Sequence, residues 1–254
     1  DWVYAFMRGG QGTRPAQRAH MFEWAGQAVM RSGWNGSDTW AWFDVGPHGF
    51  GHAHSDKLGL VLRGFGSMLL GESGIFAYNG DSKGAVLHRE FARTTSAHNS
   101  ITIDGCQQSA KPQMATAPVA AGSFAFNESG RDYVVGSMSL YDGLLGSATH
   151  TRAVSHHFTP ATPGATAKTW LVVVDRIESE LHCNHLHRDQ CRNRTLQATW
   201  HTHPNSTVTR TSASRWTIGG ADLLTGRASE AQVVVISAAG GSPWSSATEV
   251  RGQG

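Results

Sequence analysis

The amino-acid sequence predicts an all-β protein, and three observations support this fold class. Only 16% of the 254 residues are charged while 30 are glycine, a composition that suits a turn-rich β protein better than a helical one. Short segments rich in β-branched and aromatic residues recur along most of the chain, with turn residues between them. Helix signals are weak, and residues 83–93 form the one plausible short helix.

Composition also excludes several classes of function. The formal net charge is only +2 and the charged residues are mixed along the chain, which argues against a nucleic-acid partner. No stretch approaches the length of uninterrupted apolar sequence that a membrane-spanning helix needs. Nine tryptophans and ten phenylalanines supply enough apolar surface for a folded core.

Taken in order, residues 1–18 are expected to be the tail of a preceding domain or a linker, and residues 19–254 a β-sandwich domain. Apolar and polar residues alternate in 39–45 and 58–62, as in half-buried strands. Segment 168–175 (KTWLVVVD) is predicted to be a strand buried on both faces. The other strand candidates are 99–103, 133–139, 149–154, 169–176, 195–202, 206–211, 214–218 and 232–237.

Three cysteines are too few for a disulfide scaffold. Cys183 and Cys191 bracket a short His-rich loop, so they are a disulfide, two unpaired thiols or, less favoured, metal ligands, and Cys106 is left free. Four tripeptides match glycosylation acceptors, beginning at Asn35, Asn127, Asn193 and Asn205. Their excess favours a secreted or periplasmic glycoprotein.

The densest polar chemistry lies in residues 46–56 (GPHGFGHAHSD). If this segment is a strand, His52, His54 and Asp56 project from one face, where two imidazoles and a carboxylate suit a divalent metal such as zinc. The alternative is a polar edge strand with solvated histidines.

Four motifs in and around this segment resemble those of the heparinase II/III-like polysaccharide lyases, which include alginate lyases and glycosaminoglycan C5-epimerases. The motifs follow the family's order and spacing and comprise Met30–Trp34, Phe43–Leu58, Leu69–Tyr78 and Arg93–Gly105. The match is dense over residues 25–108 and looser afterwards. The resemblance implies a large antiparallel β-sandwich, which in this family follows an α/α-toroid.

The resemblance also implies site residues. The family's metal ligands correspond to His54, Glu72 and His98, and the divalent metal, with zinc expected, has a mainly structural role. The family's cleft histidine corresponds to His52, and Tyr78 stands near an active-site tyrosine, so both are expected to be catalytic.

Arg93 and Asn99 are candidates for substrate binding, with a structural hydrogen bond inside the sandwich as an equal alternative. Two residues depart from the family pattern, because Glu72 replaces an aspartate and Ala53 replaces a glycine. The indoles of Trp34, Trp40 and Trp42 are expected in the core more than against sugar rings.

The chain shows no counterpart of the toroid, which in the family supplies the principal base and acid. We therefore expect the toroid to be a separate chain, to have been cleaved off, or to be missing because the protein is truncated. The partners expected are an acidic polysaccharide and this toroid. Three functions remain: a lyase, or its β-sandwich part, that cleaves uronate polysaccharides by β-elimination; a uronate C5-epimerase; and a non-catalytic carbohydrate-binding sandwich.

Overall fold

The structure is a computed structural model. It describes residues 15–74, 82–127, 130–159, 168–180, 194–204, 206–212, 214–221 and 228–234. Tyr78, Cys183 and Cys191 lie outside these segments, whereas Cys106 is described as a free thiol. Within the described part, no helix is long and apolar enough to cross a membrane.

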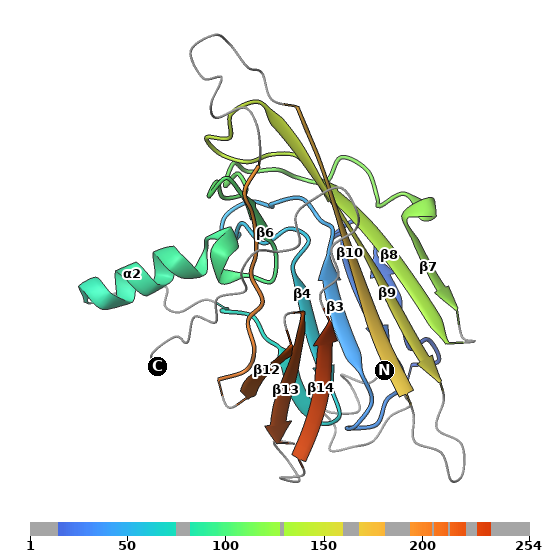
Figure 1. The fold of residues 1–254 in the computed structure, drawn as a ribbon. Helices are drawn as coiled ribbons and strands as arrows, with labels where there is room; N and C mark the ends of the chain where they lie inside the picture. Colours follow the sequence, from blue (N-terminus) through green and yellow to red (C-terminus); the bar gives the residue numbers. More distant parts are fainter. Residues whose placement is uncertain are drawn as a thin grey trace.

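Two antiparallel sheets form the body of the protein (Figure 1). The first is a meander of five strands: β1 (His20–Phe22), β2 (Gln27–Arg31), β3 (Trp40–Asp44), β4 (Leu60–Gly64) and β5 (Ser67–Leu70). The second has the order β10–β9–β8–β7, with β7 (Phe124–Asn127), β8 (Arg131–Met138), β9 (Ser147–Thr159) and β10 (Lys168–Glu180). These sheets confirm the all-β fold class and the antiparallel arrangement.

Smaller elements complete the described chain. β6 (Ile101–Ile103) pairs with β11 (Leu196–Ala198), and a separate sheet joins β12 (Thr207–Ser212), β13 (Arg215–Ala221) and β14 (Ala228–Val234). Two short 3-10 turns, η1 (Thr95–Ala97) and η2 (Ala121–Ser123), precede β6 and β7.

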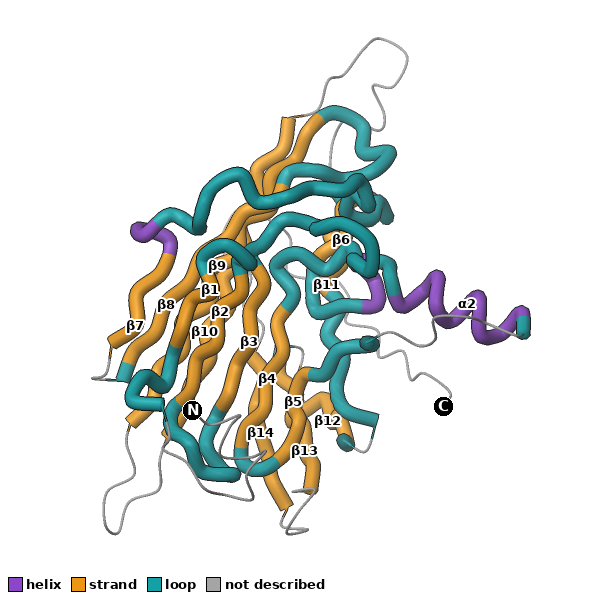
Figure 2. The backbone as a smooth tube through the Cα atoms, turned by 180° about the vertical axis from the view of Figure 1, so that it is seen from behind, coloured by secondary structure: helices purple, strands orange, loops and turns teal. Residues whose placement is uncertain are grey.

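The predicted helix is confirmed as α2 (Lys83–Ala92). It begins where the Ser82 hydroxyl accepts a hydrogen bond from the Ala85 amide, which satisfies one of the free amides of the first turn. The helix projects away from the sheets (Figures 1 and 2), and Ala92 is its only buried residue.

The core lies between the two large sheets. Ala41 and Phe43 of β3 are fully buried, as are Val134 of β8 and Val154 of β9. The sheets also meet through polar groups, since the Thr39 hydroxyl donates to the Thr169 hydroxyl at 2.8 Å. Two layers packed over a shared apolar core make this a sandwich.

Several expected details were wrong. β10 is not buried on both faces, because Trp170, Val172 and Val174 are 53%, 45% and 56% exposed, and no described layer covers their side. Trp42 does not point into the core, because its neighbours Ala41 and Phe43 take the inward positions of the alternating strand. The strand expected over 195–202 spans only Leu196–Ala198.

Candidate functional site

Residues 46–56, which connect β3 to β4, form a loop and not the strand that we expected. Gly49 has a φ of 83°, a left-handed conformation that favours glycine, and the chain bends there. Backbone hydrogen bonds fix the loop from two sides: Gly49 pairs with Gln113, and the Ser55 amide donates to the carbonyl of Arg93. The loop is therefore held by neighbouring segments, and side-chain alternation with a period of two does not apply to it.

This loop brings His54 and Asp56 to His98, which directly follows the η1 turn. Their ligand atoms all lie within 4.8 Å of one another, and the two imidazole centroids are 5.3 Å apart. His98 is only 1% exposed. Two imidazole nitrogens and a carboxylate oxygen are donors that zinc and similar divalent metals accept.

Glu72, which follows the end of β5, contacts the same group. Its Oε2 accepts a hydrogen bond from Nδ1 of His98. The other carboxylate oxygen, Oε1, and Nε2 of His98 are both buried, and neither forms a hydrogen bond with the residues that the structure describes. Buried polar atoms are normally paired, so two orphaned atoms on adjacent side chains indicate that a further ligand fits here.

The electrostatics of the group are strongly coupled. Burial lowers the pKa of His54, and the charges of His98 and Arg93 lower it further. Burial also opposes charge on His98, but the hydrogen bond and charge of Glu72, with the charge of Asp56 and the Ala92 backbone, together raise the pKa of His98. Burial raises the pKa of Asp56. The lowered pKa favours the neutral form of His54, which is the form that can donate a lone pair to a cation.

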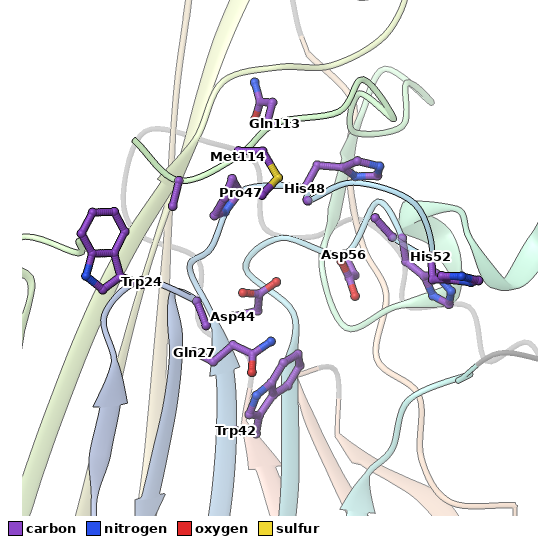
Figure 3. A pocket seen from close by; sticks show the side chains of 15 residues that line it. Trp24, Gln27, Trp42, Asp44, Pro47, His48, His52, Asp56, Gln113 and Met114 are labelled. Atoms are coloured by element: carbon purple, nitrogen blue, oxygen red, sulfur yellow. The ribbon is translucent and has the colours of Figure 1, made fainter. Parts of the chain in front are cut away.

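His52 lines a cavity of about 630 Å³ together with His54 and Asp56 (Figure 3). Trp42 and Gln27, from the strands below, form its lower side. Its other lining residues include Trp24, His48, Gln113 and Met114. The cavity therefore joins the candidate metal group to aromatic and amide groups of the kind that contact sugar rings.

Asp44 also lines this cavity, at the end of β3. Burial and the nearby charge of Asp56 raise its pKa to about 7, although the Gly46 amide, which donates to Oδ1, acts in the opposite direction. This carboxyl therefore changes charge near neutral pH.

Asn99 is not placed to bind substrate, which corrects that expectation. It is fully buried, and its amide nitrogen donates to the carbonyls of Leu60 and Gly71, both at 2.7 Å. Its amide oxygen accepts from the His201 backbone at 2.6 Å. Both donors of the amide are used inside the protein, so the structural alternative holds for this residue.

Arg93 is half-buried, and its charge acts on His54, so it lies beside the candidate site. Of the expected site residues, the structure thus brings together His54, Glu72 and His98, with His52 on the adjoining cavity and Arg93 nearby. Tyr78 lies outside the residues that the structure describes. Arg152 of β9, which contacts two of the site segments, lies in a strand that resembles the family but was not among the expected site residues.

Comparison with known proteins identifies relatives of this arrangement. The family described as "Heparinase II/III-like, C-terminal" matches residues 14–249. A structure of the heparan sulfate lyase HepC from Pedobacter heparinus is similar with a TM-score of 0.57 and 20% identity, covering 85% of this chain. A heparinase III structure matches 92% of this chain at 13% identity, with a TM-score of 0.41. None of the curated protein sequences matches this chain.

The match to HepC supports the fold alone at this level of identity. This chain spans 29% of the length of HepC and 45% of the heparinase III chain. The family match extends over nearly the whole chain and agrees with the sandwich and with the four ordered motifs. The chain belongs to the heparinase II/III-like family of polysaccharide lyases and corresponds to its C-terminal domain.

Proposed function

We propose that this chain is the β-sandwich part of a lyase that cleaves a uronate-containing, acidic polysaccharide by β-elimination. The observation that carries the proposal is the cavity that His52 shares with His54 and Asp56. It offers a proton-accepting imidazole next to a group suited to a cation, and β-elimination at a uronate needs both a base and nearby positive charge.

In this reaction the C5–H bond and the bond from C4 to its glycosidic oxygen break, and a C4–C5 double bond forms. The C5 proton becomes acidic when the charge of the C6 carboxylate is offset. Arg93 beside His54 is suited to bind that carboxylate. His52 is proposed to orient the uronate or to accept the C5 proton, and Tyr78 to protonate the departing oxygen.

We further propose that His54, His98, Glu72 and Asp56 hold a divalent metal, with zinc favoured by the two imidazoles. The orphaned atoms of His98 and Glu72 support this fit. When bound, the metal supplies a fixed charge and a fixed geometry beside the cavity. The chain's own residues keep the tasks of binding the uronate and moving the proton.

The proposal also includes a helical domain that would complete the enzyme. Because the chain spans only 29% of the length of HepC, we propose that an α/α-toroid, as a separate domain or chain, completes the cleft. A secreted or periplasmic location is proposed as well. Asn35, in the turn between β2 and β3, is exposed as a glycosylation acceptor would need to be.

Proton NMR of uronate polysaccharides in heavy water tests the function, with the chain alone and together with the toroid. An unsaturated uronate product would establish a lyase. Deuterium at C5 without cleavage would replace this proposal with epimerisation, and binding without either signal would leave a carbohydrate-binding module. His88→Ala on the exposed face of α2 is the control variant, expected to behave as wild type.

A further inference from the structure

Arg152 of β9 is fully buried and joins the two segments that carry the candidate metal ligands. Its Nη1 donates to the carbonyl of Leu58 at 2.7 Å and to the carbonyl of Asn99 at 2.6 Å. Leu58 lies two residues after Asp56, and Asn99 directly follows His98. One guanidinium nitrogen therefore bridges the backbones next to two members of the group.

The rest of the guanidinium is fixed by the second sheet. Its Nε donates to Oδ1 of Asp175 on β10 at 2.7 Å, and its Nη2 donates to Oδ2 at 3.1 Å. Nε2 of His150 lies 2.6 Å from the same Oδ1. A two-point carboxylate contact gives Arg152 one orientation, which a lysine in its place would not have.

The bridged backbone needs such support. Leu58 has a φ of 65°, a left-handed conformation that is unfavourable for a leucine and persists only where the surroundings enforce it. Its amide donates to the carbonyl of Asp44 and its carbonyl accepts from Arg152, so the strained residue is held at both ends. A released Leu58 would let the segment carrying Asp56 turn away from His98.

Further hydrogen bonds connect Asn99 to the segment that carries Glu72. The Asn99 side chain donates to the carbonyl of Gly71, the residue before Glu72, as well as to that of Leu60. The positions of Asp56, His98 and Glu72 are thus linked through backbone groups to one arginine on the opposite sheet.

We propose that Arg152 is a positioning residue, which holds Asp56 and His98 at the spacing that a divalent metal requires. The inference builds on the metal site proposed above and deepens it. In this proposal the second sheet supports the metal site. Asp175 and His150 set the orientation of Arg152, and Arg152 fixes the distance between the ligands. Residues outside the ligand set that orient ligands typically change metal affinity about 10- to 100-fold when they are lost.

The chain supplies a matched control for this proposal. Arg18 is also buried and also forms a two-point contact with a carboxylate, that of Asp132, which in turn lies near His156. Arg18 also donates to the carbonyl of Arg31 on β2 and stacks over the ring of Phe158 on β9, and neither residue is a candidate ligand. Replacing either arginine by lysine disturbs the same kind of buried pair, but only one replacement releases the site.

The experiment compares Arg152→Lys with Arg18→Lys by two measurements. Hydrogen exchange of the metal-free proteins should show faster exchange at residues 54–60 and 97–101 in R152K alone. Zn²⁺ affinity from chelator competition should fall about tenfold or more in R152K and stay within about threefold of wild type in R18K. The Co²⁺ absorption spectrum of R152K should shift, since the spacing of the donors changes.

Equal behaviour of the two variants in exchange and in affinity would overturn the positioning role. If wild type binds no metal but R152K alone loses local protection, the positioning inference stands and the proposed metal fails. If R152K does not fold, Asp175→Asn and its counterpart Asp132→Asn replace the lysine pair. The same differences are expected, and their absence would overturn the inference in the same way.

Discussion

Glu72 accepts a hydrogen bond from Nδ1 of His98, and Nε2 of the same buried imidazole forms no hydrogen bond within the described part of the chain. A carboxylate on one ring nitrogen fixes the tautomer and makes the other nitrogen a better donor to a metal. In the metal-free protein the same contact favours a proton on His98, whose pKa is raised. A proton and a metal ion therefore compete for His98, and the affinity of the site for the metal should rise with pH.

Glu72→Gln should change how stability depends on pH in the metal-free protein. The pKa of His98 is raised above its ordinary value of 6.5, so the pair stabilises the fold fully below pH 6.5 and loses this effect as pH rises through the folded-state pKa. The stability lost in E72Q should be largest in acid and should shrink above that range. Urea unfolding at a series of pH values, with a chelator present, measures this difference. A loss that is the same at every pH would contradict the assignment.

His98→Ala should remove metal binding and lower the free energy of unfolding. The substitution leaves a void and removes the hydrogen bond that the Oε2 of Glu72 accepts, and we expect a cost of roughly 2 kcal/mol in the metal-free protein. Metal content after dialysis and thermal unfolding check both parts. His88→Ala, on the exposed side of α2, should change neither, and unchanged metal content in H98A would refute the ligand set.

Local pattern was sufficient to predict part of this structure. The alternation in residues 39–45 reports local geometry, and this strand and the short helix expected over 83–93 both formed where expected. Burial depends on what covers a face. A largely apolar run such as 168–175 therefore could not show that no described layer covers the outer face of β10.

In the candidate site, too, some features follow from the local sequence and others depend on contacts made in the folded protein. The motif residues His54 and His98 converge as the resemblance implied, although the loop that carries His54 is held by partners distant in sequence. Asn99 sits within the same motif but is saturated by backbone carbonyls, and Arg152 gains its role from contacts across the sandwich. Neither role can be inferred from the local sequence, because the hydrogen-bond partners lie in segments distant along the chain.

Asp44→Asn should make stability less dependent on pH. The folded-state pKa of Asp44 is raised from 3.8 to about 7, so the neutral carboxyl suits the fold below pH 3.8 and stability is lost as pH rises to about 7. The variant keeps an oxygen for the Gly46 amide and avoids the buried charge, so it should gain on wild type over this range by up to about 4 kcal/mol. Chemical denaturation at pH 4 and pH 8 measures the gain. An equal difference at both pH values would count against the raised pKa.

His52→Ala should abolish turnover by the chain with its toroid and leave the metal bound. His52 lines the cavity but is not part of the group formed by His54, Asp56 and His98, so its loss removes a proton acceptor without removing a donor to the metal. His54→Ala should lose metal and turnover together, which makes it the matched comparison on the same loop. Product absorbance, metal content and melting temperature separate the two variants. Loss of metal in H52A would assign His52 to the metal site. Full activity of H52A would show that another group accepts the C5 proton, and His48 on the same cavity would be the next candidate.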